Sequence, residues 1–257
     1  MSSYDDESID LARAGFTRGS LAELERRVVL REFSTWVSDV TRKVNDGKEA
    51  TVYLCSGRPD APAEHLAAKM YRARKFRAFA TEGRYINPEK MRDRRLAKAI
   101  RGRSREGLRA SHHLWIDREW QALDVLFDAG ASVPKPWARC GDGILMEFLG
   151  RDGECAPALS ELKLGVDAAT RALERLLRDV EILLACGLVH GDLSAFNVLY
   201  LDDVPRLIDL PQAVRIDDAP DACSLFYRDI DNLCRYFTKC GVGTDALGIA
   251  RRLWARR

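Results

Sequence analysis

The sequence predicts an α+β fold of two lobes, the first rich in β-strands and the second mainly helical. Three short, partly alternating runs occupy residues 34–44, 50–57 and 65–71, and the turn-forming stretches NDGK and GRPDAPAE separate them. Long helical patterns dominate the second half of the chain. With 257 residues, 46% of them hydrophobic, the chain is long enough to bury the core of one large domain or of two small lobes.

The first lobe is expected to begin with a helix and to end with two further strands. Apolar residues at helical spacing predict an amphipathic helix over about residues 20–32. The stretch LWIDREWQALDVLFDAG repeats large apolar residues with a helical period and stops at a glycine. The runs SVPKPWARC and GILMEFLG then read as two strands. We therefore assign residues 1–32 to an N-terminal helical extension and 33–149 to the strand-rich lobe.

The second lobe is expected to cover residues 150–257. A long helix over about 166–186 places its leucines on one face, and the polar stretch LVHGDLSAFNVLY follows it. VLYL and PRLIDL read as a strand pair around the turn DDVP. Two helices, over about 221–238 and 243–255, end the chain.

Positive charge is concentrated in one segment of the first lobe. Residues 69–109 hold fifteen Lys or Arg against four Asp or Glu, a net charge of +11, although the whole chain carries only +2. Such a segment can bind the phosphates of an RNA, or it can be a solvated loop that its like charges keep soluble. Few large apolar residues anchor it, so we expect a flexible basic loop over about residues 77–111. An RNA or ribosomal partner stays open but is not indicated, because the segment carries no nucleic-acid motif.

Composition disfavours several other classes of protein. No run approaches the roughly 18 uncharged apolar residues that a membrane span needs, and the acidic start MSSYDDESID lacks the features of a secretory signal. The seven cysteines form no C-x-x-C pair, and the four histidines show no H-x-x-x-H spacing. A disulfide framework and a zinc site are therefore not expected. These observations predict a cytoplasmic protein with reduced thiols and no membrane partner.

Residues that suit nucleotide chemistry recur at three places along the chain. LAAK lies in the third predicted strand and carries Lys69, HGDLSAFN carries Asp192 and Asn197, and LIDLPQ carries Asp209. A nucleoside triphosphate is densely anionic, so it requires hard oxygen ligands for Mg²⁺, a cation for its phosphates and a positioned base for the incoming hydroxyl. Alone, each residue would most often be a surface lysine or a turn-capping side chain. Their order and spacing together resemble a protein-kinase-like fold and predict a phosphoryl-transfer site.

Four motifs narrow the resemblance to one branch of that fold. The sequence reads GKEATVY at 47–53, KMYR at 69–72, HGDLSAFNVL at 190–199 and IDLPQ at 208–212. These motifs resemble the signatures of the RIO kinases, an atypical serine/threonine protein kinase family with a shortened C-terminal lobe, and the resemblance covers about residues 40–240. The nucleotide loop lacks the G-x-G-x-x-G of ordinary protein kinases. Arginine outnumbers lysine, which suggests a bacterial member.

The resemblance implies a role for each matching residue. Lys69 would contact the ATP phosphates and Glu119 would hold Lys69, while Asp192 would be the catalytic base. Asn197 and Asp209 would bind Mg²⁺, with Mn²⁺ as an alternative, and Asp209 would also accept phosphate transiently, giving partial ATPase behaviour. The remaining residues expected around the nucleotide are Gly47, Lys48, Glu49, Ala50, Val52, Met146, Glu147, Leu149 and Ser194.

Ser194 has two interpretations. Its hydroxyl could orient the loop near the phosphates, or it could only cap the turn, and the turn context favours the second interpretation.

Three functions stay open. The first is a RIO-type serine/threonine kinase that binds ATP and phosphorylates an unknown protein, or itself. The second is a small-molecule kinase of the aminoglycoside or choline type, which shares H-G-D-x-x-x-x-N but normally adds a helical substrate-binding region. The third is a nucleotide-gated assembly or binding factor in which ATP turnover switches the basic segment. The GKEA motif and the short stretch of chain after Asp209 favour the first function. The three functions differ in whether the phosphate of ATP is transferred to a protein, to a small molecule or only to water.

Overall fold

The computed structural model describes residues 18–72 and 93–257, which divide between two units with separate cores. We call them the strand unit, made of residues up to Asp117 with Trp137–Phe148, and the helical unit, made of Arg118–Pro136 with Leu149–Arg257. The predicted lobes are continuous stretches of sequence, whereas both units are discontinuous. Glu119 lies in the stretch Arg118–Pro136 and so belongs to the helical unit, although the prediction placed it in the strand-rich lobe. Within the described ranges, no helix is long and apolar enough to cross a membrane.

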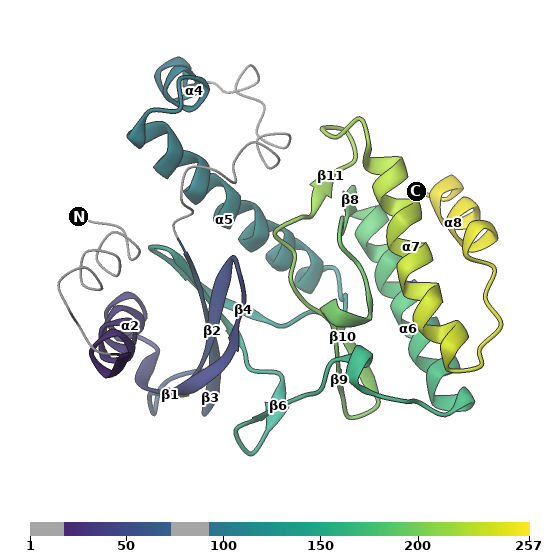
Figure 1. Cartoon of the computed structure of the whole chain (residues 1–257), viewed down its shortest axis with the longest axis horizontal. Coiled ribbons are helices and arrows are strands. Elements are labelled where there is room, and N and C mark those ends of the chain that lie inside the picture. The colour runs from purple at the N-terminus through teal and green to yellow at the C-terminus, as the bar shows by residue number, and fades with distance from the viewer. Residues whose placement is uncertain (1–17, 73–92) are drawn as a thin grey trace. The chain divides into compact units, whose positions relative to one another are not determined.

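The strand unit is built on a five-stranded sheet with the order β1-β2-β3-β5-β4 (Figure 1). Its strands are β1 (Val37–Asp46), β2 (Ala50–Gly57), β3 (His65–Tyr71), β4 (Pro136–Cys140) and β5 (Gly143–Glu147). All five were predicted, and the bounds of β2 and β3 match the prediction because clear turn-forming stretches flank both strands. The antiparallel β1–β2 pair closes tightly around the sequence GKE.

The two faces of this sheet differ. Side chains alternate along a strand, so Leu66, Ala68 and Met70 of β3 share one face, where they are buried in a cluster with apolar residues of helix α2 (Arg18–Glu32). Lys69 lies on the opposite face. Directly paired residues of antiparallel strands share a face. The register pairs Lys69 with Val52 and Ala67 with Met146, so those residues also lie opposite α2.

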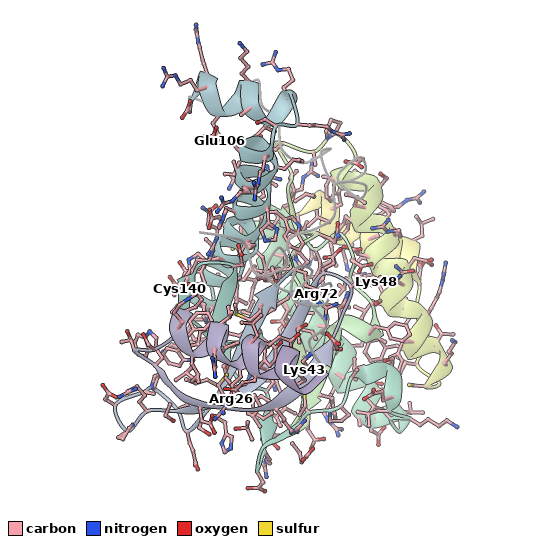
Figure 2. All side chains as sticks on the ribbon, turned by 60° about the vertical axis from the view of Figure 1, so that its left-hand side comes forward. Arg26, Lys43, Lys48, Arg72, Glu106 and Cys140 are labelled. Atoms are coloured by element: carbon pink, nitrogen blue, oxygen red, sulfur yellow. The ribbon has the colours of Figure 1, made fainter. Side chains whose placement is uncertain are left out.

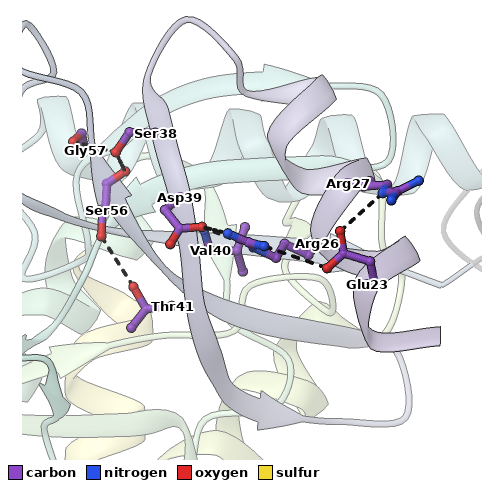
Figure 3. A network of polar contacts seen from close by, with 9 residues as sticks. All are labelled: Glu23, Arg26, Arg27, Ser38, Asp39, Val40, Thr41, Ser56 and Gly57. Atoms are coloured by element: carbon purple, nitrogen blue, oxygen red, sulfur yellow. Dashed lines mark hydrogen bonds and ion pairs between the residues drawn. The ribbon is translucent and has the colours of Figure 1, made fainter. Parts of the chain in front are cut away.

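Polar contacts add to the packing of α2 on the sheet. Lys43 of β1 pairs with the buried carboxylate of Glu25 at 2.6 Å. Arg26 Nε donates to Asp39 Oδ1 at 3.1 Å (Figure 3). Arg26 and Arg27 also lie within ion-pair distance of Glu23. Such partly exposed pairs contribute little each, so the buried apolar cluster accounts for most of the stabilisation of α2.

Helices occupy part of the segment that we expected to be a flexible loop. Residues 77–92 of that prediction lie outside the described residues. Beyond them the chain forms α4 (Arg94–Arg101) and α5 (Arg105–Asp128), so the expected loop is wrong for these helical residues. The carboxylate of Asp93 caps α4, accepting the backbone N–H groups of Arg95 at 2.9 Å and Leu96 at 3.0 Å. Arg and Lys are good helix formers, so like charges on a solvated face do not prevent a helix. Mobility of the segment stays a prediction.

The helical unit contains the C-terminal part of α5 and three further α-helices that pack around an apolar core, and all three were predicted. They are α6 (Val166–Ala185), α7 (Ala222–Lys239) and α8 (Ala246–Ala255). Leu173, Leu176 and Val180 of α6 are buried, and the Phe226 ring of α7 lies 5.3 Å from the Trp254 ring of α8. The short elements of this unit are β6 (Gly150–Arg151), β7 (Glu154–Cys155), η2 (Leu159–Glu161), β8 (Leu188–Val189), η3 (Ala195–Asn197), β9 (Val198–Leu201), β10 (Val204–Leu207) and β11 (Val214–Arg215).

Candidate functional site

Two small strand pairs hold the polar loop at residues 190–197. On its N-terminal side, β8 pairs with β11 in antiparallel register. On its C-terminal side, β9 pairs with β10, the hairpin predicted around DDVP. Because β10 leads into Asp209 and β11 follows it, both ends of the loop are bound to the segment that carries this aspartate. The helical unit therefore brings the predicted base and metal-binding residues into one place.

His190 links the two parts of the site through its imidazole. Its Nε2 lies 3.2 Å from the carbonyl oxygen of Ile208, the residue before Asp209. Burial lowers the pKa of His190, so the ring is neutral at physiological pH. Nε2 then donates to Ile208, and Nδ1 is left to accept the N–H of Asp192 at 3.4 Å. His190 thus has a structural role in this loop.

Asn197 is held between Asp192 and the strand that leads to Asp209. Its Nδ2 donates to the main-chain oxygen of Asp192 at 2.8 Å and to Asp192 Oδ2 at 3.2 Å. The main-chain carbonyl oxygen of Asn197 accepts the N–H of Ile208 at 3.0 Å. Because Nδ2 is engaged, Oδ1 is the side-chain atom of Asn197 that suits a cation. Asp192 and Asp209 are both exposed, and a carboxylate that reacts with a substrate requires such access.

Asp209 has a backbone conformation that non-glycine residues seldom adopt. Its φ is +65°, in the left-handed region. The following residue is held in place, since the N–H of Leu210 donates to Glu119 Oε1 at 3.3 Å. Rare backbone conformations persist where surrounding contacts fix them, and they gather at functional sites. Glu119 therefore contacts the Asp209 segment within the helical unit, a contact that the sequence did not predict.

The residue that anchors the main chain of this loop was not predicted from the sequence. Asp229 of α7 is 2% exposed, and its carboxylate accepts the N–H of Gly191 at 2.7 Å and that of Leu193 at 3.1 Å. The neighbouring Arg228 donates to the carbonyl oxygen of Gly191. Asp192 thus sits between two residues whose main-chain N–H groups are fixed by a single buried side chain.

Gly191 itself occupies a position that a side chain would disturb. Its φ is +81°, and a Cβ there would lie 2.4 Å from the main-chain oxygen of Gln212. We expect Gly191→Ala to destabilise the protein by about 1–3 kcal/mol, because backbone strain and a backbone clash combine. Gly165→Ala, where nothing lies within 4 Å of a new Cβ, is the matched control. Urea unfolding of both variants tests this, and equal midpoints would contradict it.

Ser194 does not cap the turn through its hydroxyl, so that interpretation is wrong. Residues Ala195–Asn197 form a single 3₁₀ turn, and the N–H of Asn197 bonds to the main-chain oxygen of Ser194 at 3.0 Å. No side-chain cap is present. The backbone closes the turn by itself, which leaves the Ser194 hydroxyl without that task.

The strand unit carries most of the other predicted nucleotide-binding residues. Val52 and Lys69 are direct partners on β2 and β3, and Lys69 Nζ lies 5.3 Å from the centre of the Tyr71 ring. Met146 and Glu147 end β5. Leu149, predicted beside them, is the first residue of the following stretch of the helical unit. The remaining members of the predicted set, at residues 47–50, form the turn between β1 and β2 and the start of β2.

Comparison with known proteins identifies the family. The model of the RIO domain matches residues 51–247. The chain belongs to the RIO family. The match includes residues of both units and contains Asp192, Asn197 and Asp209. It confirms the predicted α+β fold, a two-lobe kinase-like fold of RIO type with a β-rich first lobe and a trimmed helical second lobe.

Curated relatives of this RIO protein include eukaryotic and archaeal proteins. The serine/threonine-protein kinase RIO1 of Caenorhabditis elegans is 33% identical over 200 residues, which are 77% of this chain and 37% of the relative. The RIO-type serine/threonine-protein kinase Rio1 of Haloferax volcanii is 31% identical over 202 residues, 79% of this chain and 64% of the relative. Rio1 of Methanocaldococcus jannaschii is 31% identical over 203 residues, 76% of this chain and 62% of the relative. The chain thus spans less than two thirds of the length of these relatives, and its suggested bacterial origin stays a prediction.

Proposed function

We propose that this RIO protein is an ATP-dependent serine/threonine protein kinase. One observation carries the proposal: Asp192, Asn197 and the segment bearing Asp209 are joined by hydrogen bonds within one unit. In the proposed reaction Asp192 accepts the proton of the substrate hydroxyl as the γ-phosphoryl group is transferred. The names of the relatives, all serine/threonine-protein kinases, support the same activity.

The proposed divalent cation would be held by Asn197 and Asp209. Their amide and carboxylate oxygens are the hard ligands that Mg²⁺ prefers. The ion would take its remaining ligands from phosphate and water. Within residues 18–72 and 93–257, no group of three or more His, Cys, Asp or Glu is arranged to hold a metal ion. A site with two protein ligands that is completed by ATP fits this donor set. Mg²⁺ is the proposed ion, with Mn²⁺ as the alternative.

The phosphates would be bound from the strand unit. Lys69 supplies the cation, and the turn at residues 47–50 covers the phosphates. Glu119 is proposed to hold Lys69, and the nucleotide base is proposed to meet the main chain near Met146, Glu147 and Leu149. The protein substrate is unknown, and the chain itself is one candidate. We also propose a cytoplasmic location.

Lys69→Met tests the proposed phosphate contact. We expect kcat/KM for ATP to fall by about ten- to hundredfold, since a charge-assisted hydrogen bond to phosphate is lost. The matched control is Lys239→Met at an exposed position of α7, which is expected to behave as wild type. A change of less than twofold in folded Lys69→Met would remove Lys69 from the site.

A further inference from the structure

A polar cluster at the edge of the predicted nucleotide loop joins three strands. Arg72 directly follows β3, Asp46 ends β1, and Thr51 is the second residue of β2. The Arg72 guanidinium donates to Thr51 Oγ1 at 2.8 Å and to the Asp46 carboxylate (Arg72 is labelled in Figure 2). Thr51 Oγ1 in turn donates to Asp46 Oδ1 at 2.9 Å. The three side chains form a closed set of contacts, which we call the Arg72 clamp.

The main chain of Arg72 holds the same loop. Its N–H donates to the carbonyl oxygen of Glu49 at 3.0 Å, which extends the β2–β3 ladder into the loop. On the other side, the N–H of Gly47 bonds to the carbonyl oxygen of Ala50 at 3.0 Å. Residues 47–50 are thus fixed by main-chain bonds at both ends and by the Arg72 clamp at their base.

The burial of Thr51 makes the clamp sensitive to the loss of Arg72 or Asp46. Thr51 is 1% exposed, so its hydroxyl depends on Arg72 and Asp46 for its hydrogen bonds. The hydrogen bond from Thr51 lowers the pKa of Asp46, and the charges of Arg72 and Lys43 lower it further. Asp46 is therefore a carboxylate at neutral pH and pairs with the guanidinium.

We propose that Arg72 is a positioning residue that holds the 47–50 loop, through Asp46 and Thr51, in the conformation that binds the phosphates of ATP. The inference rests on the proposed kinase function. A loop that samples other conformations binds its ligand more weakly, in proportion to the fraction that stays competent. Removing the clamp therefore weakens nucleotide binding without touching the residues that transfer phosphate.

The test compares Arg72→Met, Asp46→Ala and the double variant with wild type. We expect each single variant to raise the dissociation constant of Mg·ATP about three- to tenfold, as a partly exposed polar network would, with kcat within about twofold. The double variant should bind Mg·ATP about as tightly as the single variant with the lower affinity, because the residues of one network act together. Arg58→Met, an exposed arginine just after β2 of the same sheet, is the control. Calorimetry gives the dissociation constants and steady-state kinetics gives kcat.

Amide hydrogen exchange without nucleotide provides a second readout. Loss of the clamp should speed exchange of the Gly47 and Arg72 amides at least about fivefold, because both amides are bonded within the loop. Unchanged exchange, or a binding defect in Arg72→Met that Asp46→Ala does not share, would overturn the proposal. The second result would mean that Arg72 contacts phosphate directly. A wild-type protein that binds no Mg·ATP would overturn the proposed function instead, and the exchange rates would still show whether Arg72 holds the loop.

Discussion

Replacing Asp192 with alanine is expected to lower the rate of phosphoryl transfer by about 10²–10⁴-fold, while the dissociation constant of Mg·ATP changes by less than about threefold. A general base acts mainly in the transition state, so its loss has little effect on ground-state binding. The loop should keep its shape, because Asn197 Nδ2 retains its bond to the main-chain oxygen of residue 192 at 2.8 Å. Steady-state kinetics and calorimetry on the same preparation measure the two effects.

An exposed aspartate of the same unit supplies the control for this experiment. Asp217 lies after β11, outside the proposed site. Asp217→Ala should therefore retain both activity and nucleotide affinity. Equal losses of affinity and turnover in a folded Asp192→Ala protein would show that Asp192 holds the nucleotide, contrary to its proposed role as base.

Asp229→Ala is expected to destabilise the protein by about 2–6 kcal/mol. It should also lower activity, although Asp229 is not proposed to touch the substrate. The change leaves the buried N–H groups of Gly191 and Leu193 without their acceptor, at a cost of about 1–3 kcal/mol for each. The loop that carries Asp192 would then lose its fixed position. Urea unfolding measures the free energy of unfolding, and kinetics at a temperature well below the transition measures the loss of activity.

Asp231→Ala is the matched control for Asp229. It lies two residues further along α7, and its side chain is 47% exposed in an ion pair with Arg235. Its loss should change stability by no more than about 0.5 kcal/mol. Similar unfolding midpoints for the two variants would contradict the anchoring role of Asp229.

The same residue gives stability a predictable pH dependence. Burial raises the pKa of Asp229 to about 7, although its two N–H donors oppose this shift. A folded-state pKa above the unfolded value contributes stability that is complete below about pH 4 and is lost as the pH rises through about 7. The advantage of wild type over Asp229→Asn should therefore be larger at pH 5 than at pH 8. The opposite order in urea unfolding would contradict the direction of this shift.

Most regular elements could be predicted from the sequence because their patterns are long or clearly bounded. The strands at residues 50–57 and 65–71 lie between turn-forming stretches, and α6 repeats leucine at helical spacing from Leu173 to Leu184. The pairs β8–β11 and β6–β7 were not predicted, since each strand has only two residues and no period can be read from two residues. The helix α4 was missed because its positive charge was interpreted as a property of a loop.

The residues of the candidate site that lie in short sequence motifs could be predicted. Those that act through contacts between distant parts of the chain could not. Asp192, Asn197 and Asp209 were found in the sequence because the motifs that carry them resemble those of kinases. Asp229 bonds to groups 36 and 38 residues away, which no local pattern shows. A signal was present, because Asp229 lies on the apolar face of α7 with Phe226 and Ile230, and a carboxylate on a buried face requires partners. The Arg72 clamp similarly depends on the register of three strands.

The most direct test of the proposed kinase activity is transfer of the γ-phosphate of ATP. Purified wild type, Asp192→Ala and Asp209→Ala proteins would be incubated with Mg²⁺ and γ-labelled ATP, with and without a general protein substrate. The label on protein would then be tested for sensitivity to hydroxylamine, which cleaves acyl phosphates. We predict hydroxylamine-resistant label on serine or threonine that is lost in Asp192→Ala. Label that hydroxylamine removes and that disappears only in Asp209→Ala, or free phosphate without labelled protein, would contradict the kinase assignment and indicate an ATPase.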